Sequence, residues 1–138
     1  MLREEIKNHL PHREPMLLVD DMTKEGETAI GHYHVRGDEY FLQGHFPDYP
    51  VVPGVILCEI MGQCSATLLL EELPGRLPFY AGLDKVRFKN QVRPGDVITV
   101  TSHIANHRGL TFFIEAEARV DGKLCVKGEL IFMLVDKQ

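Results

Sequence analysis

One apolar segment near the middle of the chain constrains the fold more than any other feature. It opens at Pro53 and runs to about Leu73, which is longer than a strand needs. Proline is favoured at the first helical position, because the N–H that it lacks would have no partner there. The segment therefore predicts a buried helix. The longest apolar stretch, over 51–70, is interrupted by Pro53, Glu59 and Gln63, so it falls short of a comfortable membrane span.

The rest of the chain divides into short elements at turn-forming residues. We expect a short amphipathic helix over 2–10 that ends before Pro11. Six segments are typical of strands: 16–23, 27–36, 79–92, 96–106, 110–120 and 123–135. Hairpin turns are expected at Arg108-Gly109 and Asp121-Gly122. Long antiparallel strands and one helix that is apolar on most of its surface predict a sheet wrapped about a central helix, an α+β fold.

Length and composition bound the function. With 138 residues, 44% hydrophobic and 25% charged, the chain fits one globular domain, expected over residues 1–138. A formal net charge of −5 gives no argument for nucleic acid or an anionic membrane as partner. The start, MLREEIKNHL, has no apolar core, so no signal peptide is expected. Cys58, Cys64 and Cys125 show no C-x-x-C spacing, which suggests neither a disulfide framework nor a zinc cage. We therefore expect a soluble protein of the reducing cytoplasm.

Glu59 is the only charged residue of the predicted helix before Glu71, and Gln63 follows it one turn later on the same face. A buried carboxylate is costly, so this group should be paired, neutral or facing a cavity. Two interpretations are open on the helix alone. Glu59 and Gln63 can bond to each other or to a neighbouring subunit, or Glu59 can take part in chemistry.

His45 lies in the loop just upstream, over 44–50, where glycine and prolines can hold a side chain rigidly. A lone histidine is more often structural. Here an imidazole with an ordinary pKa of roughly 6.5 stands a few residues before a helix that carries a carboxyl group in apolar surroundings. Such surroundings favour the protonated carboxyl, so Glu59 could hold its proton while His45 is neutral. The pair predicts one base and one acid.

The start of the helix offers a third component. The amides of Gly54, Val55 and Ile56 lack intrahelical acceptors and lie at the positive end of the helix dipole. A thioester carbonyl placed there would be polarised as its α-proton leaves. Gly54 has no side chain to obstruct this approach. The alternative is that Gly54 only packs closely against a strand.

Two other candidate sites carry less weight. His32 and His34 share one strand face, but no third ligand is evident, so we predict no metal and treat them as surface or interface residues. Cys58 adjoins Glu59 but faces another side of the helix, so a core thiol is expected rather than a nucleophile. No cofactor is predicted.

A cluster of cations marks the first strand after the helix. Lys85, Arg87 and Lys89 alternate with apolar residues, which places three cations on one strand face, with Arg93 nearby. The commoner explanation is that they are solvated or protect a sheet edge. They are also the best local site for an acidic partner.

Three blocks of sequence stand in order over nearly the whole chain: LPHREPMLLVDDM at 10–22, GHFPDYPVVPGVILCEIMGQ at 44–63 and YAGLDKVRFKNQVRPGD at 80–96. Together they resemble the (3R)-hydroxyacyl-acyl-carrier-protein dehydratases of the FabZ type, which implies a hotdog fold. In this resemblance the family's histidine, the base, falls on His45 and its glutamate, the acid, on Glu59. Gly54 would supply the amide that holds the thioester carbonyl, and Val55 the backbone carbonyl that orients the histidine.

The resemblance also implies partners. The substrate is carried by an acyl carrier protein, whose expected docking site is Lys85, Arg87, Lys89 and Arg93. Two subunits would join their sheets side by side, so that each active site combines His45 of one chain with Glu59 of the other. Members often assemble further into trimers of dimers. The acyl chain would enter a tunnel lined by the helix, including Gln63, and by residues near Tyr80 and Phe88.

Three rivals remain. A FabA-type dehydratase-isomerase has aspartate at the position of Glu59 and a tryptophan soon after, whereas this chain contains no tryptophan. Hotdog thioesterases generally lack the GHFP histidine. A non-catalytic module that binds acyl chains is opposed by the presence of both His45 and Glu59. Departures from the family pattern at Glu14, Met16 and the segment after Glu59 fall on expected tunnel walls and leave the chain-length preference open.

Overall fold

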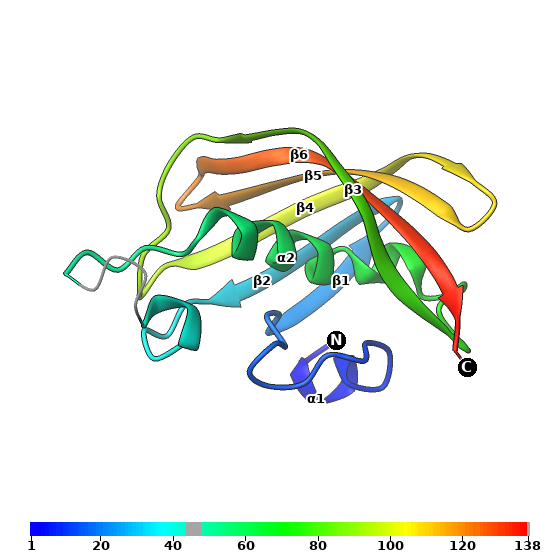
Figure 1. The fold of residues 1–138 in the computed structure, drawn as a ribbon, viewed down its shortest axis with the longest axis horizontal. Helices are drawn as coiled ribbons and strands as arrows, with labels where there is room; N and C mark the ends of the chain where they lie inside the picture. Colours follow the sequence, from blue (N-terminus) through cyan, green and yellow to red (C-terminus); the bar gives the residue numbers. More distant parts are fainter. Residues whose placement is uncertain (44–47, 138) are drawn as a thin grey trace.

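The fold is built on a six-stranded antiparallel sheet (Figure 1). The computed structural model describes residues 1–43 and 48–137. The strands are β1 (Asp21–Glu25), β2 (Thr28–His34), β3 (Arg76–Phe88), β4 (Val97–Arg108), β5 (Thr111–Val120) and β6 (Lys123–Asp136). Their order is β1-β2-β4-β5-β6-β3, so β1 and β3 are the edges. The sheet curves around helix α2 (Gly54–Cys64), and the predicted α+β arrangement is confirmed.

Helix α2 is shorter than the helix predicted over 53–73. It ends at Cys64 with Ser65 as its C-cap, and Ala66–Leu69 continues as a 3₁₀ turn, η2. The Ser65 hydroxyl donates to the carbonyl of Met61 at 2.7 Å and bonds the hydroxyl of Ser102 on β4 at 2.7 Å. A side-chain bond to the carbonyl one turn back competes with regular helix, and the bond to β4 pins this end to the sheet. No helix in the described residues is long and apolar enough to cross a membrane.

The core lies between α2 and the inner face of the sheet. Ile60 and Met61 of α2 are fully buried together with Ile98 of β4, Ile114 of β5 and Leu130 of β6. Burying each such side chain stabilises the fold by about 1.5–3 kcal/mol. Among the described residues, the buried apolar side chains other than Val51 form one cluster.

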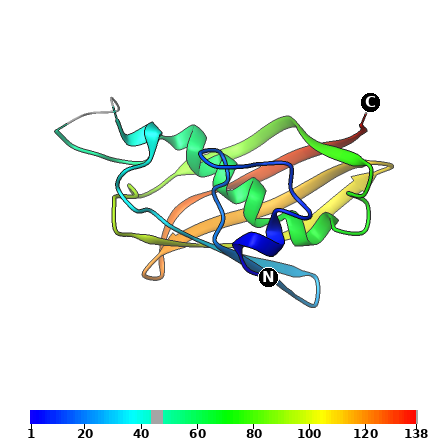
Figure 2. The same cartoon turned by 90° about the horizontal axis from the view of Figure 1, so that it is seen from below.

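The N-terminal segment passes across α2 (Figure 2). Its helix α1 (Arg3–Ile6) is shorter than the helix predicted over 2–10. Beyond it the chain continues in turns, and the amide of Leu10 bonds the carbonyl of Ile6 at 2.9 Å. Both Ile6 and Leu10 are buried, so this segment is packed into the core.

Strand β1 begins at Asp21, which corrects the predicted start at Met16. The backbone groups of the intervening stretch are bonded to side chains. The guanidinium of Arg3 donates to two of its carbonyl oxygens at 2.8 and 3.0 Å. The amide of Gln63 on α2 bonds two more of its backbone groups at 2.7 and 2.8 Å. These bonds replace a strand ladder and tie the N-terminal segment to the helix.

Two-residue turns close the long hairpins. Asp121 and Gly122, between β5 and β6, have φ of 50° and 78°, as a type I′ turn requires, and this predicted turn is confirmed. The β4–β5 turn is Gly109-Leu110, one residue later than predicted, because Arg108 still pairs within the sheet. Gly109 has φ of 58°, a conformation that glycine adopts without strain.

Strand β3 spans Arg76–Phe88, earlier at both ends than the strand predicted over 79–92. It ends where the chain turns to a different partner. The carbonyl of Val92 accepts a bond from the amide of Val52 at 2.8 Å, and Val92 is fully buried. The segment after β3 therefore lies beside the residues that lead into α2.

Candidate active site

Glu59 is the one charged residue of α2, and its side chain is 23% exposed. It faces a cavity of about 200 Å³. One wall is α2, and the opposite walls come from the loop at Leu10 and His12 and from Tyr80 of β3 and Phe132 of β6. Most of this lining is apolar, so the carboxyl group meets a space suited to a hydrocarbon chain.

Gln63 fixes the orientation of this carboxyl group. The backbone N–H of Leu18 donates to Oε1 of Gln63 at 2.7 Å, and since an N–H can only donate, that atom is the amide oxygen. The Nε2 group of Gln63 therefore donates to the carbonyl of Met16 at 2.8 Å and to Oε2 of Glu59 at 2.8 Å. Gln63 is 2% exposed, so water does not compete with these bonds. Oε2 of Glu59 is an acceptor, and a proton on the carboxyl group belongs on Oε1.

Tyr80 closes the far side of the cavity. Its hydroxyl donates to the carbonyl of Cys58 at 2.6 Å, and its ring lies 4.2 Å from that of Phe132. Burial raises the pKa of Tyr80, so the phenol stays neutral. A Cβ at Gly62 would lie 2.6 Å from the Tyr80 hydroxyl, so only glycine admits this contact. The predicted tunnel residues Gln63 and Tyr80 thus line one cavity with Glu59.

Gly54 is the first residue of α2 and lies against Phe88. A Cβ at Gly54 would approach ring atoms of Phe88 at 2.9 Å. The close packing considered from the sequence is therefore present. Among the described residues the amides of Gly54 and Val55 have no backbone acceptor, so they remain able to bind a ligand. The prediction was wrong for Ile56, whose amide bonds the carbonyl of Pro53 at 3.0 Å. Phe88 and the side chain of Val55, which is 76% exposed, lie outside the cavity that contains Glu59.

Histidine reaches Glu59 from an unexpected position. His45 lies outside the described residues. His12 lines the cavity, and its Nε2 is 3.4 Å from Oε2 of Glu59. Burial lowers the pKa of His12 below its ordinary value of 6.5, against the opposing effect of Glu59. The sequence analysis missed this residue, and the only signal was its place in the block LPHREPMLLVDDM.

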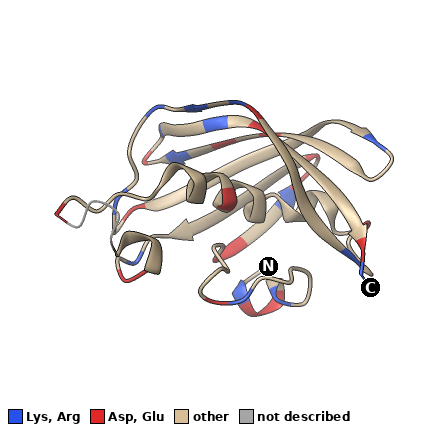
Figure 3. Ribbon diagram, in the orientation of Figure 1, with Lys and Arg blue, Asp and Glu red and all other residues tan. Residues whose placement is uncertain are grey.

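The cations near β3 form two groups. The strand is bulged between Asp84 and Arg87, and Lys85 has φ of 54°, so the strict alternation predicted for this stretch is wrong. Lys85 and Arg87 nevertheless line one surface groove, together with Lys127 of β6, which the sequence analysis missed. Figure 3 shows Lys and Arg gathered along this part of β3 and β6.

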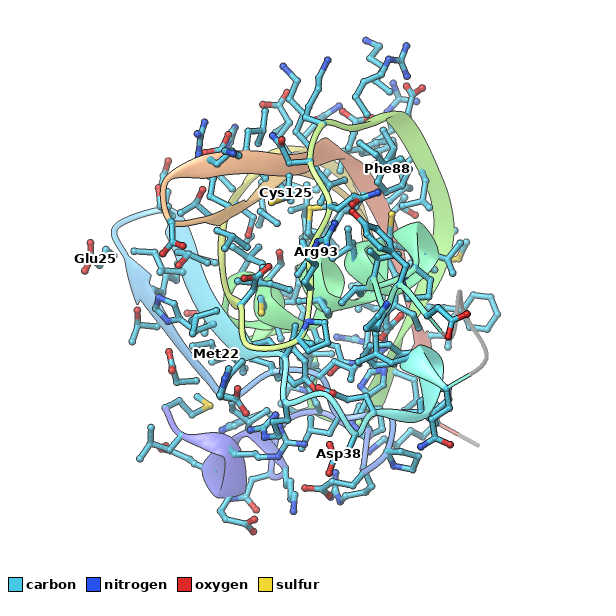
Figure 4. The ribbon with its side chains drawn as sticks, turned by 90° about the vertical axis from the view of Figure 1, so that its left-hand side faces the viewer. Met22, Glu25, Asp38, Phe88, Arg93 and Cys125 are labelled. Atoms are coloured by element: carbon cyan, nitrogen blue, oxygen red, sulfur yellow. The ribbon has the colours of Figure 1, made fainter. Side chains whose placement is uncertain are left out.

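The other cations lie past the end of β3. Lys89 is exposed, and its amide bonds the carbonyl of Cys125 at 2.7 Å. The guanidinium of Arg93 lies 4.0 Å from the ring centroid of Tyr49. Figure 4 views the molecule from the end where Phe88 and Arg93 lie. The prediction that Lys85, Arg87 and Lys89 share one strand face is therefore wrong, because Lys89 lies past the end of β3.

The two candidate sites that carried less weight, the histidine pair on β2 and Cys58, show no sign of a metal site or a nucleophile among the described residues. His32 has Nδ1 2.7 Å from Oδ1 of Asp21, and His34 is exposed on the same strand. In the described part of the chain, no three His, Cys, Asp or Glu side chains gather as metal ligands. Cys58 is buried, and burial raises the pKa of its thiol, so the prediction of a core thiol is confirmed.

Solved structures share this fold. The chain matches the dehydratase heterocomplex ApeI:P from Xenorhabdus doucetiae with a TM-score of 0.81, at 20% identity over 96% of this chain and 91% of that one. It matches the fluoroacetyl-CoA thioesterase FlK with a TM-score of 0.69, at 15% identity over 84% and 90%. Identities this low show the fold alone. The FabA-like domain family matches residues 10–129, so the chain is a FabA-like hotdog domain, and the predicted hotdog fold is confirmed.

Relatives with similar sequences narrow the class of hotdog protein to which the chain belongs. The chain is 49% identical over 133 residues to the 3-hydroxyacyl-[acyl-carrier-protein] dehydratase FabZ of Clostridium perfringens, covering 94% of this chain and 96% of the relative. It is 47% identical to the FabZ of Streptococcus pneumoniae, over 95% and 96%, and 45% identical to that of Bacillus licheniformis, over 98% and 96%. The chain belongs to the FabZ family of 3-hydroxyacyl-[acyl-carrier-protein] dehydratases.

Proposed function

We propose that this protein dehydrates (3R)-hydroxyacyl-acyl-carrier-protein to trans-2-enoyl-acyl-carrier-protein in fatty-acid biosynthesis. One observation carries the proposal beyond family membership. Glu59 is held at an apolar cavity with Oε2 fixed as an acceptor, which leaves Oε1 to carry a proton toward the substrate. This is the arrangement that a general acid needs.

The reaction requires a base that removes a proton from one carbon and an acid that protonates the hydroxyl group on the next carbon. His45 takes the proton from the carbon next to the thioester carbonyl, and Glu59 gives its proton to the departing 3-hydroxyl, which leaves as water. The electrons of the broken C–H bond form the new double bond. Because the base gains one proton and the acid loses one, the two groups must exchange a proton before the next cycle.

The thioester carbonyl needs a donor while its neighbouring carbon loses a proton. Gly54 is proposed to supply that donor from its backbone amide, at the positive end of α2. The packing of Phe88 on Gly54 supports this assignment, because it fixes the position of the amide. The backbone carbonyl of Val55 is proposed to orient His45. Gln63 and Tyr80 are proposed to contact the acyl chain in the cavity.

We propose a homodimer joined along β3, with His45 of one subunit and Glu59 of the other in each site. Edge strands with exposed apolar side chains are prone to pair with another chain. On β3, Phe79 is 63% and Leu83 49% exposed, and Met133 on neighbouring β6 is 43% exposed. A trimer of such dimers is the further assembly expected from the family resemblance.

The proposed partner is an acyl carrier protein, docked by Lys85, Arg87, Lys89 and Arg93, with Lys127 added to the set. Opposite charge on the partner would speed association and orient the delivered chain. Acidic side chains of β5 and β6, namely Glu115, Glu117 and Glu129, line the same groove. A cytoplasmic location is proposed because the three cysteines are free and buried, as a reducing compartment favours.

The test is an assay with carrier-bound 3-hydroxyacyl chains of several lengths. Mass spectrometry should detect the loss of water and no release of free thiol. Free thiol would instead identify a thioesterase, and binding without turnover would identify a non-catalytic module. Gas chromatography of the product would reveal a shifted double bond if isomerase activity accompanied dehydration.

A further inference from the structure

His12 is a titratable group that the proposed reaction does not use. It comes from the N-terminal segment, not from α2 or the sheet, yet it lines the cavity beside Glu59. The guanidinium of Arg13 holds this turn in place. It donates to the carbonyls of Lys7 and Leu10, each at 2.9 Å, and to that of His12 at 2.6 Å. These bonds hold the loop that carries the imidazole beside α2.

The surroundings of the ring select one tautomer. Nδ1 of His12 is buried and has no hydrogen-bond partner among the described residues. Nε2 lies 3.4 Å from Oε2 of Glu59, an oxygen that already accepts a bond from Gln63. A lone pair of Nε2 facing that oxygen would be repelled, and an N–H at Nδ1 would be left without an acceptor. The neutral ring should therefore carry its proton on Nε2.

The charge of the ring follows from its position. In the part of the chain that the structure describes, Glu59 on α2 and Arg13 in the same loop act on the charge of the ring, and the neutral phenol of Tyr80 on β3 lines the same cavity. Burial, aided by Arg13, lowers the pKa of His12 and outweighs Glu59. A neutral donor suits an acid better than a cation would, because a cation would hold Glu59 as the carboxylate.

We propose that His12 is a positioning residue for the acid: Oε2 of Glu59 accepts a bond from the amide of Gln63 and lies 3.4 Å from Nε2 of His12, so that in the reacting complex both groups donate to Oε2 and leave the proton on Oε1 for the substrate hydroxyl. This role rests on the proposed function of Glu59. When Glu59 gives up its proton, the same two donors stabilise the carboxylate that forms. Hydrogen bonds to a charged group are stronger than those to a neutral one, so the stabilisation grows as the proton leaves.

Two substitutions separate this role from simple filling of the cavity wall. His12→Leu keeps apolar bulk without a donor, and His12→Gln keeps an N–H donor that cannot titrate. We expect His12→Leu to lower kcat about tenfold with little change in KM, as loss of one donor to a charged group predicts. The pH profile of kcat should change as well in His12→Leu, because one of the two groups placed to donate to Oε2 of Glu59 is gone. His12→Gln should recover most of kcat and the wild-type pH profile.

Three outcomes decide the matter. Wild-type kcat and pH profile in His12→Leu, with Glu59→Gln inactive, would overturn the role of His12 and leave the acid in place. Full activity in Glu59→Gln would overturn the proposed function itself. Should His12→Leu fail to fold, ¹⁵N NMR of the wild-type imidazole gives the answer. A neutral Nε2–H tautomer at pH 7 is expected, and a cation or an Nδ1–H tautomer would contradict the proposal.

Discussion

Gln63 donates from Nε2 to Oε2 of Glu59 at 2.8 Å, one helical turn away, while its other bonds hold residues of the N-terminal segment. One buried amide thus joins the proposed acid to a segment that lies 45 residues before Gln63 in sequence. The two interpretations of Glu59 that the sequence left open are compatible: Oε2 bonds to Gln63, and within residues 1–43 and 48–137 no bond to Oε1 is seen. The N-terminal segment is consequently part of the site's support.

Gln63→Leu should cost both stability and activity. The substitution leaves the buried amide of Leu18 without a partner, which costs about 1–3 kcal/mol, and it also removes the partly buried bond to the carbonyl of Met16. The free energy of unfolding, measured by urea titration, should fall by that order, and kcat should fall at least tenfold because Glu59 can rotate. Gln91→Leu, at an exposed glutamine, is the matched control and should change stability by less than about 0.5 kcal/mol. Unchanged stability in Gln63→Leu would contradict this bonding.

Acid should destabilise the folded chain through His12. Burial lowers its pKa in the folded state, whereas the unfolded chain regains the ordinary value of 6.5. As pH falls below 6.5 the unfolded chain takes up the proton first, so unfolding is favoured. The contribution to stability is complete above pH 6.5 and is lost as pH falls toward the folded pKa. Between pH 7 and pH 5, thermal melts should show a smaller loss of stability for His12→Leu than for wild type. His9→Leu, at an exposed histidine, should keep the wild-type dependence.

The sequence predicted the parts of this site that depend on neighbours along the chain. Proline before an apolar run located the start of α2, and four-residue spacing placed Gln63 beside Glu59. It did not predict that β1 starts at Asp21 or that His12 reaches Glu59, because both depend on contacts between distant segments. The bulge at Lys85 was missed as well, since a single left-handed residue in a strand has no local signature when it is not glycine.

Gly54→Ala should impair the reaction without unfolding the chain. A methyl group at this position meets the ring of Phe88 at 2.9 Å, so the ring or the helix start must shift. A displaced amide would no longer meet the thioester carbonyl, and kcat/KM should fall by about 10²-fold, as for loss of one oxyanion donor. Phe88→Leu in the same chain relieves the contact and should restore part of the activity. A Gly54→Ala enzyme with wild-type kinetics would remove this amide from the site.

Carrier docking should depend on charge and salt. Reversing Lys85 and Arg87 to glutamate should raise KM for carrier-bound substrate severalfold and leave a short thioester analogue nearly unaffected. Rising salt should weaken wild-type binding, because exposed charges are screened beyond about 8–10 Å. Lys24→Glu, at an exposed position of β1, is the matched control with the same kind of charge reversal. Equal losses on both substrates would assign the cations to stability.

The shared site can be tested by mixing two inactive proteins. His45→Ala lacks the base and Glu59→Gln lacks the acid, so each should be inactive alone. A two-fold dimer that pairs His45 of one chain with Glu59 of the other contains two composite sites at one interface. In a mixed dimer one site receives both lesions and the other receives neither. Random exchange makes about half of the dimers mixed, so activity should recover to about a quarter of wild type if the sites act independently.

The same experiment distinguishes the alternative in which both residues of a site come from one chain. Every site would then keep one lesion, and mixing would restore nothing. Native mass spectrometry of the mixture establishes that subunits have exchanged, which a mass difference between the two variants makes visible. Exchange without recovery would therefore rule out the composite site. Recovery would mean that the two halves of each site meet across the subunit boundary. The edge strand β3, with exposed Phe79 and Leu83, would then be the first region in which to disrupt the dimer.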